Sequence, residues 1–286
     1  MTKWFSTRGM TRIAICAPSA PLARDAAAKV ANLARAAFPA LELVFHYQCF
    51  AEAGHFAGCD AERLAALLEC ANDPGTQAVW FARGGYGAVR IAAGVVAGMG
   101  PNARAKTFFG YSDSGALLGA LYRAGIGHPV HGPIPGDIRR AGGEAAVLRA
   151  LDYLAGGRRG LEPSIDHRPT VAFNLMTLAS IVGTPLMPDL AGHVVMIEEV
   201  SEHLYAVDRL LFHVTAHLAP AGIAGLRLGL VTDVPENDRP FGSKPEAMVQ
   251  DWCTRTGIAY LGRADIGHDA DNKIVPFGLA SASGRP

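Results

Sequence analysis

Three side chains that are far apart in this sequence, Ser112, Glu198 and His268, are together suited to nucleophilic catalysis. A serine hydroxyl is a weak nucleophile at neutral pH. A serine hydrolase therefore supplies a histidine that takes its proton and usually a carboxylate that orients the histidine. Each of the three residues could also have a purely structural role, so the sequence around each one must be weighed for and against a catalytic role.

Ser112 lies in the run Gly110-Tyr111-Ser112-Asp113-Ser114, between the β-prone segment 106–109 and the helix-prone segment 116–122. Hydrolases usually display a nucleophilic serine at such a turn from strand to helix. The match to the GxSxG elbow is incomplete, because Ser114 stands where the second glycine is expected. The alternative is a helix cap, since a serine before a helix accepts hydrogen bonds from free amides.

Glu198 directly follows the apolar segment 194–197. The pattern predicts that it emerges at the carboxyl end of a buried strand, where catalytic acids tend to lie. The alternative is that Glu198, Glu199 and Glu202 form a solvated strand end or the first turn of the next helix.

His268 is one of ten histidines, and it lies in the polar, glycine-containing loop 265–269, just before the segment 273–276. A side chain in such a loop can project into a cleft. The alternative is an ordinary histidine in a surface loop.

Glycines follow the predicted strand 77–82 in the run Arg83-Gly84-Gly85-Tyr86-Gly87. A turn of this kind exposes backbone N–H groups. It could bind a phosphate, although it lacks the GxGxxG and GxxxxGK[ST] patterns. It could instead donate to the oxyanion of a tetrahedral intermediate, with the amide of Asp113 as the second donor. The alternative without chemistry is the tight turn that a doubly wound sheet needs.

Strand and helix patterns alternate in the first half of the chain, which predicts a parallel sheet covered by helices, with the active-site edge at the carboxyl ends of the strands. The predicted strands are 12–17, 41–45, 77–82, 107–111 and 128–131, and the predicted helices are about 22–37, 60–71, 87–98 and 113–123.

The alternation stops at the Gly-, Arg- and Pro-containing segment 156–163, which we interpret as a crossing between domains. We expect an N-terminal, doubly wound, mostly parallel α/β domain over 1–155 and a smaller C-terminal α/β domain with a mixed sheet over 164–286. In the second domain the pattern predicts strands at 194–197 and 226–231 and helices from 204 to 214 and from 245 to 256.

The chain has 286 residues, half of them hydrophobic, with 26 basic and 26 acidic side chains, so no long-range field favours nucleic acid or an anionic membrane. A small polar substrate fits better. The five cysteines contain no CxxC pair, which argues against a disulfide framework or a zinc cluster.

No apolar run approaches the length of a membrane span, and the apolar stretch 13–17 is too short for the core of a signal peptide. We therefore expect a cytoplasmic protein.

Several segments, taken in order, resemble the LD-carboxypeptidases of serine peptidase family S66, the group that also contains the microcin C immunity peptidases. The resemblance spans nearly the whole chain. The matching segments are 17–19, 56–58, 62–64, 83–87, 110–113, 174–175, 183–185, 197–199, 208–209 and 267–268.

The resemblance implies a Ser-Glu-His triad, with Ser112 as nucleophile, Glu198 as the residue that orients the histidine and His268 as base. It also implies oxyanion donors at the amides of Asp113 and Gly85, no metal or other cofactor, and a homodimer. The implied reaction releases D-alanine from meso-diaminopimelate in a peptidoglycan tetrapeptide, a muropeptide, during cell-wall recycling.

Two positions depart from the family pattern: Ala172-Phe173-Asn174 stands where Gly-Gly-Asn is frequent, and Glu199 where Asp is usual. Phe173 could reshape the floor of the cleft. The alternatives are an immunity-type peptidase that cleaves a peptidyl or aminoacyl nucleotide, for which we expect an aromatic platform, and a catalytically silent muropeptide-binding protein.

Overall fold

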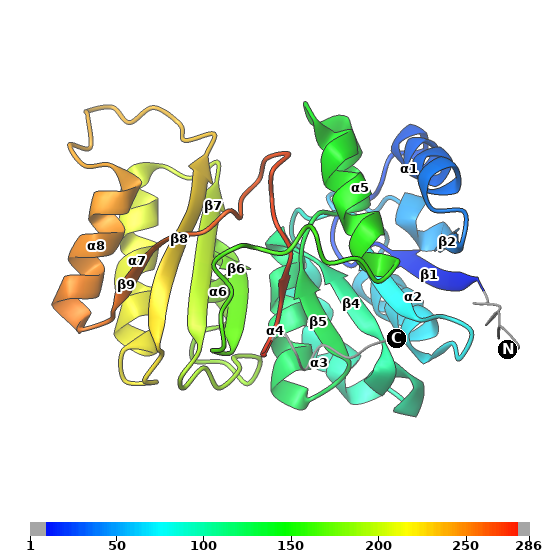
Figure 1. The fold of residues 1–286 in the computed structure, drawn as a ribbon, viewed down its shortest axis with the longest axis horizontal. Coiled ribbons are helices and arrows are strands. Elements are labelled where there is room, and N and C mark those ends of the chain that lie inside the picture. Colours follow the sequence, from blue (N-terminus) through cyan, green and yellow to red (C-terminus); the bar gives the residue numbers. More distant parts are fainter. Residues whose placement is uncertain (1–9, 280–286) are drawn as a thin grey trace, which may run out of the picture.

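A computed structural model describes residues 10–279. These residues form two units with mainly parallel sheets, placed side by side (Figure 1). The outer ends of the two expected domains, 1–9 and 280–286, lie outside the described residues. The first unit holds a six-stranded sheet in the order β10-β5-β4-β3-β1-β2, in which only β10 is antiparallel to its neighbour. Its strands are β1 (Thr11–Cys16), β2 (Leu41–Phe45), β3 (Ala78–Phe81), β4 (Thr107–Gly110), β5 (His128–His131) and β10 (Val275–Pro276).

Helices cover both faces of this sheet, so its central strands are apolar on both sides. In β3, Ala78 and Trp80 pack in one hydrophobic cluster, whereas Val79 and Phe81 pack in the other. Helices α1 and α5 cover the first face, and α2, α3 and α4 cover the second. Their bounds are α1 (Arg24–Ala37), α2 (Asp60–Asn72), α3 (Ala88–Gly98), α4 (Gly115–Ala124) and α5 (Gly143–Leu154).

The second unit holds a four-stranded sheet in the order β6-β7-β8-β9, with every pair parallel. The α/β class is confirmed, but the mixed sheet expected here is wrong. The antiparallel strand that follows His268 pairs with β5 of the first sheet instead. The elements are β6 (Thr170–Asn174), α6 (Leu175–Ile181), β7 (Val194–Val200), α7 (Leu204–Leu218), β8 (Gly225–Thr232), α8 (Pro245–Thr256) and β9 (Tyr260–Arg263).

The strand β10 joins the two sheets. On one side Val275 pairs with His131 of β5. On the other side Gly278, just beyond β10, exchanges two backbone hydrogen bonds of 2.9 and 3.0 Å with Thr170 of β6. Figure 1 shows this red segment between the green strands of the two units. At β10 the chain therefore crosses back from the second unit to the first.

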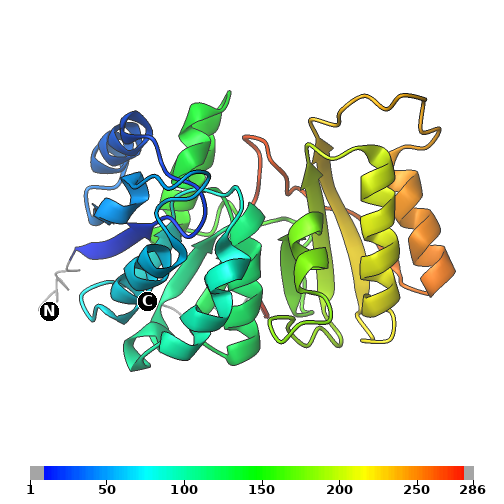
Figure 2. The same ribbon diagram turned by 180° about the vertical axis from the view of Figure 1, so that it is seen from behind.

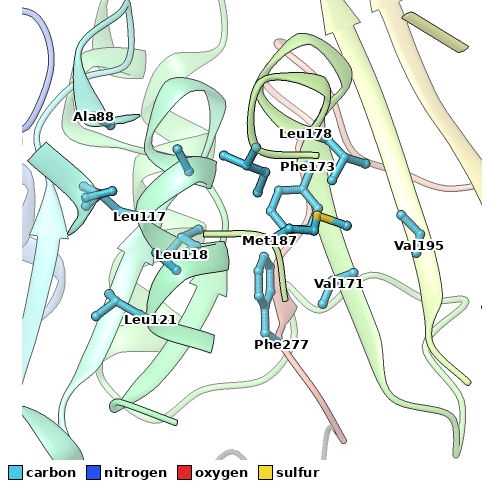
Figure 3. Close-up of a cluster of buried hydrophobic side chains, with 14 of the residues drawn as sticks. Ala88, Leu117, Leu118, Leu121, Val171, Phe173, Leu178, Met187, Val195 and Phe277 are labelled. Atoms are coloured by element: carbon cyan, nitrogen blue, oxygen red, sulfur yellow. The ribbon is translucent and has the colours of Figure 1, made fainter. Parts of the chain in front are cut away.

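A shared apolar core also holds the units together. Helix α4 packs against α6, and seen from behind the two helices lie side by side in front of the sheets (Figure 2). Leu121 of α4 belongs to the same buried cluster as Phe173, Phe277 and Val195, as Figure 3 shows. Burial of these side chains stabilises one relative placement of the two units.

The order of strands in the first sheet reverses between β1 and β3, and the loops at the carboxyl ends of such strands are the usual ligand-binding region. Short 3₁₀ helices lie in several connecting segments. They are η1 (Tyr47–Phe50), η2 (Pro101–Ala105), η3 (Ser112–Ser114) and η4 (Pro135–Arg139). Among residues 10–279, no helix combines the length and apolar character required to cross a bilayer.

Candidate active site

Ser112 begins the short helix η3, two residues after β4 ends. Its φ is 60°, a left-handed conformation that costs a serine on the order of 1–3 kcal/mol and that persists only where the surroundings enforce it. The capping interpretation is wrong, because Tyr111 and Ser114 occupy the N-cap positions of η3 and α4 and Ser112 caps neither helix. The hydroxyl is instead available to a neighbouring side chain.

Glu198 lies inside β7 and is fully buried, so the solvated-end interpretation is wrong. The pairing of β7 with β8 shifts register between Ile197 and Glu199, which places an irregularity at Glu198 itself. Across it, a Cβ on Gly229 would lie 3.0 Å from the Cβ of Glu198, so this position of β8 has room only for glycine. The carboxylate is thus set by a rigid strand.

His268 connects the other two side chains. Its Nδ1 lies 2.7 Å from Oε2 of Glu198, and its Nε2 lies 3.0 Å from Oγ of Ser112. It is 8% exposed, so the surface-loop interpretation is wrong. An imidazole with a carboxylate on one nitrogen and a hydroxyl on the other can donate to the carboxylate and accept the hydroxyl proton. The structure therefore brings together all three residues proposed from the sequence.

The glycine turn packs directly against the serine. A Cβ on Gly84 would lie 2.9 Å from Oγ of Ser112 and 3.9 Å from the amide nitrogen of Asp113. Gly85 has φ of +116°, which a residue with a side chain rarely adopts. Within residues 10–279, neither the Gly85 nor the Asp113 N–H donates to another backbone carbonyl outside the helices and strands. The glycine turn thus lies against the hydroxyl of Ser112 at Gly84, the residue before the predicted donor Gly85.

The Asp113 side chain fastens three loops at this edge. Its Oδ2 accepts from Oγ of Ser19 at 2.5 Å and from the backbone N–H of Ala88 at 2.8 Å. Burial raises the pKa of the Asp113 carboxyl, and these hydrogen bonds partly oppose that rise. Because Ser19 follows β1 and Ala88 begins α3 after β3, the turn that holds Ser112 is tied to the loops after these two strands, which lie on the same side of β4.

Aromatic and polar side chains surround the histidine. The ring of Tyr111 packs 4.8 Å from that of His268, and its hydroxyl donates to Asp137 at 2.8 Å. Nε2 of His131 lies 3.1 Å from Oδ1 of Asn272, and burial lowers the pKa of His131 to about 4. His131 is therefore neutral near pH 7, and it places no positive charge beside His268.

Glu199 has a different environment from its neighbour Glu198. It is 2% exposed and accepts hydrogen bonds from the side chain of Asn174 at 2.7 Å and the backbone of Met176 at 2.8 Å. Burial raises its pKa to about 7 despite these bonds. Asn174 in turn caps α6 by accepting from the backbone of Thr177. Glu199 therefore organises the start of α6 and does not contact His268 through any described hydrogen bond.

Two contributors to the site were not found from the sequence. Thr177 donates to the backbone carbonyl of Ser112 at 3.3 Å, and Arg140 donates to the backbone carbonyl of His268. Both contacts cross between the units and involve backbone atoms, so no motif marks them. Among the described residues, no three His, Cys, Asp or Glu side chains cluster in a way that could hold a metal ion.

Comparison with protein families matches both units. Residues 13–132 match the model of the LD-carboxypeptidase N-terminal domain, and residues 169–282 match that of the C-terminal domain. The chain belongs to the LD-carboxypeptidase family, peptidase family S66. As a member of this family of peptidases it is a serine-type hydrolase.

One curated relative of this family member is the murein tetrapeptide carboxypeptidase of Pseudomonas aeruginosa, which is 25% identical over 289 residues, 93% of this chain and 91% of the relative.

Solved structures share the fold. The muramoyltetrapeptide carboxypeptidase of Oxalobacter formigenes superposes with a TM-score of 0.77 over 94% of this chain and 96% of that one, at 23% identity. The microcin C7 self-immunity protein MccF, in its wild-type apo state, gives a TM-score of 0.76 over 94% of this chain and 91% of its own, at 16% identity. At these identities the likeness shows the fold of this LD-carboxypeptidase family member and nothing finer.

Proposed function

We propose that the protein is a serine LD-carboxypeptidase that hydrolyses the bond between meso-diaminopimelate and the terminal D-alanine of a peptidoglycan tetrapeptide. The relative from Pseudomonas aeruginosa is named a murein tetrapeptide carboxypeptidase, which supports this substrate class. Turnover of such a peptide inside the cell would serve cell-wall recycling, so the proposal includes a cytoplasmic location. It also includes a homodimer.

The contact of His268 with both Ser112 and Glu198 carries the proposal. Distances of 2.7 and 3.0 Å allow proton transfer without rearrangement of the two units. The histidine comes from the second unit and the serine from the first, so catalysis requires both. We accordingly retain 1–155 and 164–286 as the proposed domains, with 156–163 as the crossing segment between them.

In the proposed reaction, Oγ of Ser112 attacks the carbonyl carbon of the scissile amide while Nε2 of His268 takes the hydroxyl proton. The tetrahedral intermediate collapses when His268 returns that proton to the amide nitrogen, and D-alanine leaves. Water then attacks the acyl-enzyme by the same route and releases the shortened peptide. Glu198 holds the imidazole in the required tautomer and stabilises its positive charge.

Backbone N–H groups of Gly85 and Asp113 are the proposed donors to the oxyanion. The proximity of the glycine turn to Oγ of Ser112 supports this assignment, since the intermediate's oxygen must lie within hydrogen-bonding distance of donors beside the serine. Donors fixed in a partly buried turn need little reorganisation as negative charge develops, and this is a main source of catalytic power.

The test is mass spectrometry of two tetrapeptides that differ only in the stereochemistry of the terminal linkage. After incubation with the protein, we expect a product shorter by one D-alanine from the LD-linked peptide and no product from the DD-linked one. Equal cleavage of both, or of neither, would refute the proposal.

The fold shared with MccF gives a second candidate, an immunity-type peptidase that cleaves a peptidyl or aminoacyl nucleotide. The same assay with an aminoacyl sulfamoyl adenosine separates the two candidates, because only the immunity-type enzyme would release the amino-acid portion. A silent binding protein would cleave neither and would also fail to react with a serine-directed phosphonate.

A further inference from the structure

The loop that carries His268 belongs to the second unit by sequence but is held by side chains of the first. Three of its backbone carbonyls, at His268, Ala270 and Asn272, accept hydrogen bonds from arginines. Arg140 donates to His268, and Arg149 donates to Ala270 at 2.9 Å and to Asn272 at 3.0 Å. Arg140 follows η4 and Arg149 lies on α5, both in the first unit.

A buried carboxylate orients the first of these arginines. Asp137 lies 3.1 Å from Nε of Arg140, and it also accepts from the backbone of Ile134 at 2.9 Å and from the hydroxyl of Tyr111 at 2.8 Å. Because the guanidinium is planar, holding Nε on Asp137 fixes the direction of the Nη1 donor toward His268. The Tyr111 ring packs on the imidazole, so one network contacts the histidine from two sides.

The second arginine fits a site built for it. Its side chain is 13% exposed, and a Cβ on Gly160 would lie 2.3 Å from its Cγ, so only glycine leaves room for it there. The loop also packs closely on the first unit, since a Cβ on Gly142 would lie 2.8 Å from the Cβ of Ala270. These contacts fix the loop at several points beyond the histidine.

We infer that Arg140, oriented by Asp137 and assisted by Arg149, is a positioning residue that holds the His268 loop in register with Ser112. It acts through the backbone of the histidine and touches no reacting atom. Without it, the second unit still supplies the imidazole, but the distance of 3.0 Å between Nε2 and Oγ is no longer enforced. This inference rests on the proposed function only in assigning His268 as the base.

A neutral fluorophosphonate probe tests the inference independently of the peptide substrate. Ser112 attacks phosphorus, the O–P bond forms, the P–F bond breaks, fluoride leaves and His268 takes the serine proton. The probe carries no carboxylate, so its rate reports the alignment of serine and histidine and not the recognition of a peptide terminus. If the wild-type protein reacts with the probe but does not cleave tetrapeptides, the proposed function is refuted, and the role of Arg140 can still be tested with the probe.

We expect Arg140→Ala to slow labelling by about 10–100-fold, the usual cost of a displacement on the order of 1 Å in a catalytic group. Arg140→Lys keeps one donor and should recover part of the rate. Guanidinium chloride, at concentrations far below those that unfold the protein, should accelerate the Ala variant and leave the wild type unchanged. Arg149→Ala should have a smaller effect, because its acceptors lie beyond the histidine.

Arg139→Ala is the matched control, since Arg139 is exposed, adjacent in sequence and without a described contact to the loop. It should label at the wild-type rate.

Peptide kinetics should show a lower kcat for Arg140→Ala with KM nearly unchanged. Wild-type labelling by Arg140→Ala, or a raised KM with normal labelling, would overturn the inference, the latter in favour of substrate binding. Circular dichroism shows whether Arg140→Ala folds. If it does not fold, Arg140→Lys is used instead. The inference would then be overturned if Arg140→Lys labels at the wild-type rate and the further substitution Arg149→Ala does not slow its labelling.

Discussion

The carboxyl edges of the two sheets contribute to one site, yet they hold their catalytic candidates in different ways. The first sheet holds Ser112 mainly within its own unit, in a strained turn braced by the glycine turn and by Asp113, with one added hydrogen bond from Thr177. The second sheet holds Glu198 inside a strand, but its histidine is on a loop whose carbonyls bond to the first unit. Two of the three groups are thus fixed locally, and the third depends on contact between the units.

The first prediction concerns the locally fixed serine. Ser112→Ala should lower kcat/KM for D-alanine release by at least about 10⁴-fold, because no other described hydroxyl lies at Nε2 of His268. The melting temperature should change little, since the hydrogen bond between Oγ of Ser112 and His268 is the one side-chain hydrogen bond of Ser112 that is described. A variant that keeps wild-type release would show that the nucleophile is elsewhere.

The second prediction concerns the carboxylate of the second sheet. Glu198→Gln should lower kcat by about 10²–10⁴-fold, because a neutral amide orients the imidazole poorly and does not stabilise its charge. Glu198→Asp should also lose activity, since its carboxylate withdraws from Nδ1 by one methylene. Single-turnover kinetics will separate this effect from binding. Activity of either variant near that of the wild type would argue that strand β7 does not supply the orienting group.

The third prediction uses Glu199, which is next to Glu198 but has a structural role. Its pKa is raised from 4.5 to about 7 in the folded protein, so the folded state binds a proton that the unfolded state has released. Stability from this group is therefore full below about pH 4.5 and is lost as pH rises through 7, by up to about 3 kcal/mol. Glu199→Gln removes this loss.

Urea unfolding at pH 5 and pH 8 checks the Glu199 prediction. The free energy of unfolding of Glu199→Gln minus that of the wild type should be larger at pH 8 than at pH 5, so the variant gains relative stability as pH rises. Parallel pH dependences in the two proteins would contradict the raised pKa.

The smallest expected effect is that of Gly84→Ala, at the contact between the glycine turn and the serine. The added methyl would lie 2.9 Å from Oγ of Ser112, so either the turn or the serine must shift, which should lower kcat/KM by about 10-fold. Gly222→Ala serves as the control, since its Cβ would meet nothing within 4 Å. It should affect stability alone, through its positive φ. Equal activities of the two variants would show that the glycine turn tolerates movement.

Local patterns predicted the regular elements of the first half well, because strands buried on both faces must be apolar and the helices between them amphipathic. The predicted strands 41–45 and 128–131 match β2 and β5, and the helix 245–256 matches α8. Five elements were missed, namely α5, β6, α6, β9 and β10. Two of these, β6 and β10, form the junction between the sheets, where tertiary contact rather than propensity decides the conformation.

The error about the second sheet has the same cause. Alternation of strands and helices predicts that a sheet is parallel but not which sheet a final strand will join. Here Val275 pairs with His131, more than 140 positions earlier in the chain, so the antiparallel strand belongs to the first sheet. Pairing over such separations depends on the packing of the whole domain.

By itself the sequence predicted the α/β class and offered Ser112, Glu198 and His268 as candidates, because elements of regular period and the residue types of nucleophilic catalysis are local properties; the resemblance to a family supplied their expected roles. Tertiary structure alone decided that these residues meet within 3.0 Å and that Arg140 and Thr177 bond to the backbones of His268 and Ser112. Every peptide unit carries the same acceptor carbonyl, so no residue type marks which one will be used; only the folded chain brings donor and acceptor together.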